Sequence, residues 1–228
     1  MSKEVLIVKK IIVAIDGLAA TGKSSHAKRL AKEFNYTYIN TGSMYRAITY
    51  YVLENNLDQI DLISALPDLS LRFEEENNLQ KTLLNDQDIT NELQSMRVAN
   101  QVSFIAAIPK VREFLVDQQR NMGIQKDIVI DGRDIGTVVF PEAECKFFLK
   151  ANVEIRAQRR VNELHQLGSS ASFDKVVENL ELRDNSDSKR NVAPLTKAPD
   201  AVTVDVSKLT LEEVYSILKG GVMAILDR

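Results

Sequence analysis

The sequence predicts an α/β protein with a five-stranded parallel sheet and helices on both faces. Two observations lead to this prediction. Short apolar runs alternate along the chain with longer stretches in which apolar residues recur at helical spacing. The first run, residues 11–15, is entirely apolar and rich in β-branched residues, which is typical of a strand buried on both faces.

The expected elements follow in chain order. Pro109 separates two neighbouring helices, because proline is tolerated at the start of a helix but not in its interior. Strands are predicted at 11–15, 37–39, 127–130, 146–149 and 201–204. Helices are predicted at 23–34, 43–54, 98–107, 110–122, 153–167, 173–185 and 211–226.

Residues 57–96 interrupt the alternation of strands and helices. Residues 69–73 alternate apolar and polar side chains, a charged turn follows, and a strand-like stretch resumes at 79–84 before a second turn and Ile89. This pattern predicts a small antiparallel sheet inserted into the parallel architecture. Such insertions lie near the carboxyl ends of the strands, where doubly wound sheets bind ligands. From this segment alone, a plain surface feature fits equally well.

Residues 17–24 match the phosphate-loop pattern G-x-x-x-x-G-K-[ST] at every fixed position. A predicted strand precedes the loop and a predicted helix follows it, which disfavours a plain glycine turn. Backbone N–H groups of such a loop surround a phosphate at the positive end of the helix. Lys23 would reach the β- and γ-phosphates, and the Ser24 hydroxyl would bind Mg²⁺. The predicted triphosphate-binding residues are Gly17, Ala19, Ala20, Thr21, Gly22, Lys23, Ser24 and Ser25.

A second stretch of interest, residues 40–46, follows the second predicted strand. Gly42 and Ser43 indicate a turn and a helix N-cap, which would place Tyr45 and Arg46 in the first helical turn. The forked guanidinium of Arg46 would suit a second phosphate group at the same sheet edge as the loop. An ordinary surface arginine is the alternative.

A third stretch, residues 127–141, begins with an apolar strand that ends in Asp131. In phosphate-loop proteins, a carboxylate at this place approaches the metal. Gly132 allows a turn, and Arg133 and Asp134 follow at once. Three charges in four positions beside a buried strand favour a functional site over a solvated surface.

Two helices on either side of the small-residue loop 168–172 carry a cluster of cations. Arg156 and Arg160 lie four residues apart. Like charges at this spacing destabilise a helix by about 0.2–0.5 kcal/mol unless an anion lies between them. A mobile lid that supplies arginines to a transferring phosphoryl group would explain this arrangement. For Arg159, a solvated basic helix explains the sequence as well. Beyond the loop, the candidates are Arg183, Asp187 and Arg190.

Composition narrows the class of protein. The net charge of −3 argues against a broad nucleic-acid or anionic-membrane surface. No apolar stretch reaches 18 residues, and the apolar run within residues 1–10 is too short for a signal peptide. The single cysteine, Cys145, is expected to be buried in a strand, and it can form neither a disulfide framework nor a zinc site. We therefore expect a cytoplasmic protein without nucleic-acid or membrane partners, and nothing in the sequence demands an oligomer rather than a monomer.

The motifs closely resemble those of the bacterial cytidylate (CMP) kinases, a branch of the nucleoside monophosphate (NMP) kinases. The resemblance covers residues 11–205. Its most specific parts are DGRDIGTVVFP and RDxxDSxRxxAPL. The matching segments are GLAATGKSS, NTGSMYRA, ANQVSFIAAIPKVREFL, VIDGRDIGTVVFPEA, RAQRR and LELRDNSDSKRNVAPL.

The resemblance implies a phosphate-loop NTPase core with an inserted antiparallel β NMP-binding region and a helical lid, in one domain over residues 1–228. It assigns 10–42, 97–152 and 191–228 to the core, 43–96 to the NMP-binding region and 153–190 to the lid. It implies transfer of the γ-phosphoryl group of ATP to CMP or dCMP, with Mg²⁺, giving ADP and CDP or dCDP.

The resemblance also implies roles for individual residues. The catalytic ones are Lys23, Arg133, Arg183 and Arg190, and lid residues Arg156 and Arg160 contact the donor. The acceptor-binding ones are Thr41, Tyr45, Arg46, Ser103, Arg112, Asp131, Arg133, Asp134, Arg183, Asp187 and Arg190, with Ser24 on the metal.

The chemistry of cytosine agrees with two of these roles. Asp134 can accept from the exocyclic amine, and Arg112 can donate to the ring acceptors. Uracil would face Asp134 acceptor to acceptor, which costs about 1–3 kcal/mol. A kinase for UMP or AMP, and a nucleotide-dependent switch without transfer activity, are the alternatives.

The sequence departs from the family pattern in three places. Leu18 and Ala20 replace a common Pro and a common Gly or Ser in the loop, and Asn40 replaces a frequent Asp. Ser186 and Ser188 stand where some members have arginine, so the number of lid arginines is open.

Overall fold

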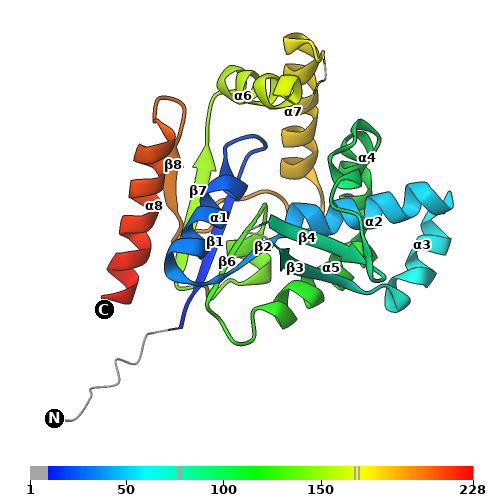
Figure 1. The fold of residues 1–228 in the computed structure, drawn as a ribbon, viewed down its shortest axis with the longest axis horizontal. Helices are drawn as coiled ribbons and strands as arrows, with labels where there is room; N and C mark the ends of the chain where they lie inside the picture. Colours follow the sequence, from blue (N-terminus) through cyan, green and yellow to red (C-terminus); the bar gives the residue numbers. More distant parts are fainter. Residues whose placement is uncertain (1–9, 77–78, 167, 169, 228) are drawn as a thin grey trace.

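The computed structural model describes residues 10–76, 79–166, 168 and 170–227. Its main sheet contains five parallel strands, as predicted, and their ends lie within two residues of the expected ones. Figure 1 shows the sheet at the centre of the molecule. The strand order is β2 (Thr37–Asn40), β6 (Ile128–Gly132), β1 (Ile12–Gly17), β7 (Cys145–Lys150) and β8 (Val202–Asp205).

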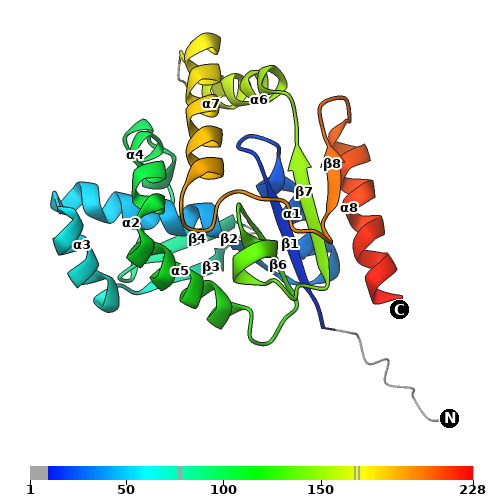
Figure 2. The same cartoon turned by 180° about the vertical axis from the view of Figure 1, so that it is seen from behind.

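Helices cover both faces of the sheet, which Figures 1 and 2 show from opposite sides. On one face, α1 (Lys23–Phe34) and α8 (Leu211–Leu226) pack apolar side chains such as Leu30 and Leu218 against β1 and β7. On the other face, α2 (Thr41–Asn55) and α5 (Pro109–Met122) pack against alternate residues of β1 and β6. Because both faces are covered, the central strands β1 and β6 are buried along their whole length, and Cys145 is buried in β7 as predicted.

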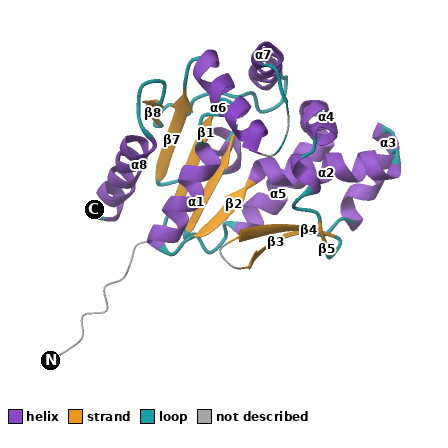
Figure 3. Ribbon diagram, turned by 45° about the horizontal axis from the view of Figure 1, so that its top comes forward, coloured by secondary structure: helices purple, strands orange, loops and turns teal. Residues whose placement is uncertain are grey.

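The insertion forms the predicted antiparallel sheet, which Figure 3 shows beside α2. Its apolar side chains, among them Leu71 and Leu84, join the core cluster that contains α2 and α5. The insertion consists of α3 (Gln59–Ala65), η1 (Leu66–Asp68), β3 (Leu71–Glu76), β4 (Leu79–Leu84), β5 (Gln87–Asp88) and η2 (Glu92–Gln94). The helix α3 was not predicted; it has seven residues, and the side chain of its N-cap, Asp58, accepts from Ile60 N and Asp61 N.

Two helix boundaries correct the prediction. α2 begins at Thr41 and not at Ser43, because the N-cap is Asn40, whose side chain accepts from Ser43 N at 3.1 Å. Tyr45 and Arg46 therefore lie in the second turn of the helix and not in the first. α7 (Phe173–Lys189) continues four residues beyond the predicted end, which brings Asp187 to its buried face.

The remaining helices are α4 (Met96–Ala107) and α6 (Val153–Gln166), together with the short π-helix η3 (Ile135–Val139). Leu167 and Ser169 of the predicted lid region, and nearly all of the apolar run within residues 1–10, lie outside the described residues. Among the residues that the structure describes, no helix has the length and apolar character needed to span a membrane.

The strand register positions the site. Gly17 of β1 pairs with Leu149, Asp16 with Gly132, and Asn40 with Asp131. The phosphate loop, the start of α2 and the segment after β6 therefore leave the sheet at the same edge. This edge is where parallel α/β sheets bind their ligands.

Candidate active site

A cavity of about 950 Å³ opens at the carboxyl edge of the sheet. It is lined by every predicted site residue except Gly17 and Arg156. The residues brought together are Ala19, Ala20, Thr21, Gly22, Lys23, Ser24, Ser25, Thr41, Tyr45, Arg46, Ser103, Arg112, Asp131, Arg133, Asp134, Arg160, Arg183, Asp187 and Arg190.

Gly17 lies outside the cavity because it is the point at which the phosphate loop leaves β1. Its φ is +144°, and an added Cβ would lie 2.0 Å from the carbonyl oxygen of Leu149. Only glycine fits this position, so Gly17 shapes the loop and does not line the cavity. Gly22, with φ 86°, is the N-cap of α1, which points the helix N-terminus at the loop.

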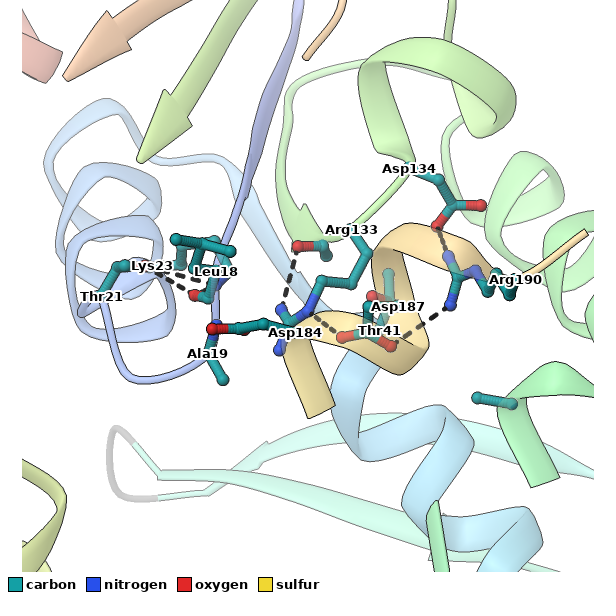
Figure 4. A network of polar contacts seen from close by, with 12 residues as sticks. Leu18, Ala19, Thr21, Lys23, Thr41, Arg133, Asp134, Asp184, Asp187 and Arg190 are labelled. Carbon is teal, nitrogen blue, oxygen red and sulfur yellow. Dashed lines mark hydrogen bonds and ion pairs between the residues drawn. The ribbon is translucent and has the colours of Figure 1, made fainter. Parts of the chain in front are cut away.

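Lys23 is buried inside the loop. Its ammonium group donates to the carbonyl oxygen of Leu18 at 2.6 Å and to Thr21 Oγ1 at 3.4 Å (Figure 4). Burial, and then the nearby Arg133, hold the pKa of Lys23 well below its ordinary value. An anion placed beside the buried ammonium group would strongly stabilise its charged form.

Ser24 and Asp131 provide adjacent oxygen ligands. The Ser24 hydroxyl donates to Asp131 Oδ2 at 2.9 Å, and Tyr38 donates to Oδ1 at 2.7 Å. Burial raises the pKa of Asp131, and Lys23 opposes that rise. A hydroxyl and a carboxylate are hard oxygen ligands that fit Mg²⁺, an ion that usually takes one or two protein ligands beside phosphates and water. Among the described residues, no three or more Asp, Glu, His or Cys side chains lie together so that they could hold a metal ion by themselves.

The far end of the cavity contains a buried ion pair. Arg112 Nη2 donates to Asp134 Oδ2, and Arg112 Nη1 donates to the carbonyl oxygen of Ala106 at 3.0 Å. The Arg112 guanidinium lies 5.3 Å from the ring centre of Tyr45. Arg190 Nη2 lies 3.6 Å from the other Asp134 oxygen (Figure 4). These groups form a pocket wall with both donors and an acceptor.

Between the two ends lies a cluster of arginines. Arg133 Nε donates to Asp187 Oδ2 at 2.8 Å, and Arg46 donates to the carbonyl oxygen of Leu93 at 3.0 Å. Burial, followed by repulsion from neighbouring guanidinium groups, lowers the pKa of Arg46 to about 9 and that of Arg183 to about 10. The buried Nε of Arg183 has no hydrogen-bond partner among the described residues. So many mutually repelling cations indicate a site for an anion.

Asp16 supports the site and was not among the predicted residues. It is buried at the end of β1, and its two carboxylate oxygens accept from Ile135 N and Gly136 N, both at 2.8 Å. Burial raises the pKa of Asp16 to about 6. Asp16 therefore fastens the segment after Asp134 to the strand that carries the phosphate loop. The only signal in the sequence was a charged residue at the end of an otherwise apolar strand.

Arg156 contacts the phosphate loop itself. Its buried guanidinium donates to the carbonyl oxygens of Ala151 and Ala19 and to Asp184 Oδ2, at 3.0, 3.2 and 2.6 Å. Asp184, also missed, accepts from Ala19 N at 3.4 Å, and Figure 4 shows it beside Ala19. The structure thus places Arg156 against the backbone of the loop and outside the cavity, whereas Arg160 lines the cavity and pairs with Glu163.

Comparisons with known proteins agree with this geometry. The family described as cytidylate kinase matches residues 13–220. The chain is 48% identical to a cytidylate kinase of Phocaeicola vulgatus over 90% of this chain and 93% of the relative. It is 43% identical to a cytidylate kinase of Streptococcus gordonii over 96% of this chain and 100% of the relative. A solved structure of an uncharacterized protein from Eubacterium ventriosum has the same fold, with a TM-score of 0.54 at 13% identity over 96% of this chain and 100% of that one. The resemblance found in the motifs is confirmed, and the chain belongs to the cytidylate kinase family.

Proposed function

We propose that this chain transfers the γ-phosphoryl group of ATP to CMP or dCMP, forming ADP and CDP or dCDP. Membership of the cytidylate kinase family supports the reaction. The observation that carries it is that one cavity has the phosphate loop at one end, the Arg112–Asp134 pair at the other and the arginine cluster between them. A donor triphosphate and an acceptor monophosphate would meet at the cluster.

The donor end would hold ATP through the backbone N–H groups of the loop and through Lys23. Ser24 and Asp131 would hold Mg²⁺, which when bound supplies positive charge to the donor phosphates. Lys23 would exchange its contact with the Leu18 carbonyl for a phosphate oxygen. Its lowered pKa supports this role, because an anion restores the stability of the buried ammonium group.

At the acceptor end, Arg112 and Asp134 would recognise the cytosine base, with Ser103 on α4 beside them. Their buried positions support selectivity, because a base with the wrong edge leaves a buried polar group unpaired. The cost of about 1–3 kcal/mol corresponds to about 5- to 150-fold discrimination against UMP.

The arginines at the centre would bind the acceptor phosphate and the transferring group. We assign Arg46 and Arg133 to the CMP phosphate, and Arg183 and Arg190 to the charge that spreads over the phosphoryl oxygens in the transition state. Asp187 would hold Arg133 in place and approach the ribose. No general base is needed, because the attacking phosphate oxygen is already ionised.

The division into moving parts remains a proposal. The NMP-binding region 43–96 and the lid 153–190 would close over the core, and closure would keep water from accepting the phosphoryl group. The cavity receives side chains from all three parts, which supports such closure. We also propose that the enzyme acts as a cytoplasmic monomer on small nucleotides, without a nucleic-acid partner.

A panel of acceptors tests the function. ADP formation from ATP and Mg²⁺ is measured in a coupled assay with CMP, dCMP, UMP and AMP. We expect CMP and dCMP to be used far better than UMP and AMP. Equal use of UMP or AMP would contradict the base specificity, and no ADP release with any acceptor would favour a nucleotide-dependent switch.

A further inference from the structure

Tyr38 on β2 lies outside the predicted site and yet contacts its central carboxylate. Its hydroxyl donates to Asp131 Oδ1 at 2.7 Å, while the Ser24 hydroxyl donates to Oδ2 at 2.9 Å. We infer that Tyr38 is a positioning residue that orients the Asp131 carboxylate toward Ser24 and the Mg²⁺ of the donor. This inference rests on the proposed function, since it concerns the metal that accompanies ATP.

The strand register explains how Tyr38 reaches Asp131. Tyr38 pairs with Val129, and Asp131 is two residues farther along β6 on the same face of the sheet. Val129 and Tyr38 pack in the cluster under α1, the helix that carries Ser24 at its start. The three polar groups therefore meet between the sheet and the N-terminus of α1.

Tyr38 is itself held firmly. Its backbone carbonyl accepts from Gln80 Nε2 of β4 at 2.7 Å, which ties this part of β2 to the inserted sheet. The Tyr38 hydroxyl lies 2.7 Å from Asp131 Oδ1 and acts as the donor, because an ionised carboxylate can only accept. A fixed donor on Oδ1 leaves Oδ2 as the oxygen that faces Ser24.

The physical consequence is a carboxylate with one permitted orientation. Asp131 is buried, and without the Tyr38 hydroxyl its Oδ1 would lack this donor. The carboxylate would then be free to turn toward other donors, among them Lys23, whose charge already acts on it. Groups that orient a metal ligand in this way typically contribute about 10- to 100-fold to metal affinity or activity.

The test is Tyr38→Phe, which removes only the hydroxyl. Calorimetric titration measures the affinity for the ATP analogue AMP-PNP with Mg²⁺ and with a chelator. We expect the Mg²⁺-dependent gain in affinity to fall by about 10-fold, while the affinity without Mg²⁺ stays within about twofold. Tyr36→Phe is the matched control, because the buried Tyr36 hydroxyl has no hydrogen-bond partner among the described residues, and it should leave the gain unchanged.

An unchanged or increased gain in Tyr38→Phe would overturn the inference, and so would an equal loss with and without Mg²⁺, which would mean a structural role. A second comparison tests whether Tyr38 acts through Asp131. In an Asp131→Asn background, Tyr38→Phe should change the Mg²⁺-dependent gain no further. None of these readouts requires transfer to CMP, so a failure of the proposed acceptor specificity would be distinguished from a failure of this inference.

Discussion

Replacing Asp134 by alanine removes the carboxylate that faces both Arg112 and Arg190 at the far end of the cavity. The side chains of Asp134 and Arg112 are only 5% and 3% exposed, so solvent cannot replace the lost contact. A hydrogen bond to a charged group contributes about 1.5–3 kcal/mol, which corresponds to a fall of about 10- to 150-fold in kcat/KM for CMP. Among the described residues, the Asp134 side chain pairs with Arg112 and Arg190 and with no residue of the phosphate loop, so the KM for ATP should change by less than about twofold.

Asp134→Asn is the matched variant, because it keeps the shape and one acceptor oxygen. Its amide N–H₂ would face the cytosine amine donor to donor and would suit the uracil carbonyl. We therefore expect the ratio of kcat/KM for CMP to that for UMP to fall by at least about 10-fold in this variant. Steady-state kinetics with both acceptors at saturating ATP, and with ATP at saturating CMP, supply the numbers.

Leaving Arg112 and Arg190 buried without their partner also threatens the fold, since breaking a buried pair costs about 3–5 kcal/mol. The unfolding free energy of each variant is therefore measured beside the kinetics, and temperatures are chosen at which the protein is folded. Parallel losses for CMP and ATP in a folded Asp134→Ala protein would refute the reasoning, because Asp134 would then be structural.

Three further predictions follow from the supports of the site. The pKa of Asp16 is raised to about 6, so between pH 4 and 6 the folded state binds more protons than the unfolded state and the contribution of Asp16 to stability falls as pH rises. Relative to Asp16→Asn, the unfolding free energy should therefore decline by about 2 kcal/mol from pH 4 to 7 in denaturant titrations, and a constant difference would contradict this. Ala20 has a left-handed φ of 56°, so Ala20→Gly should raise the unfolding free energy by up to about 1 kcal/mol, as measured by chemical denaturation; a loss of stability would contradict the argument. Arg156→Ala should lower the unfolding free energy by about 3–5 kcal/mol, because Asp184 loses its buried partner. Arg160→Ala, which removes a more exposed ion pair, should lower it by less than about 1 kcal/mol. Equal losses in the two variants, measured by chemical denaturation, would show that Arg156 does not support the loop.

Local patterns were enough to predict the phosphate loop and most of the elements. The loop works through consecutive residues, so Gly22 and Lys23 reveal it without knowledge of the rest of the chain. Strands and long helices are likewise visible in apolar spacing, and Lys23–Phe34 was predicted to the residue. The N-cap of α2 was misplaced because Asn40 and Ser43 are both good caps, and only the backbone geometry at Asn40 selects one of them.

Helical spacing also did not reveal the contacts of Arg156. Arg156 and Arg160 lie one turn apart and were expected to serve the same ligand. The packing of α6 against the loop turns Arg156 onto Ala19 and Asp184, while Arg160, one turn on, lines the cavity. The neighbours that each turn of a helix contacts depend on how whole elements pack together. The spacing of residues along one helix carries no information about that packing.

By itself, the sequence determined the α/β class, the triphosphate loop and the family, because these depend on short runs of neighbouring residues. Only the tertiary structure decided which side chains support the site. In the sequence, Asp16 lies 119 and 120 residues from the two residues whose N–H groups donate to it. Tyr38 lies 93 residues from Asp131, and Asp184 lies 165 residues from Ala19. Such pairs form because parallel strands and their helices bring distant ends of the chain to one edge of the sheet, and no local pattern records which residues meet there.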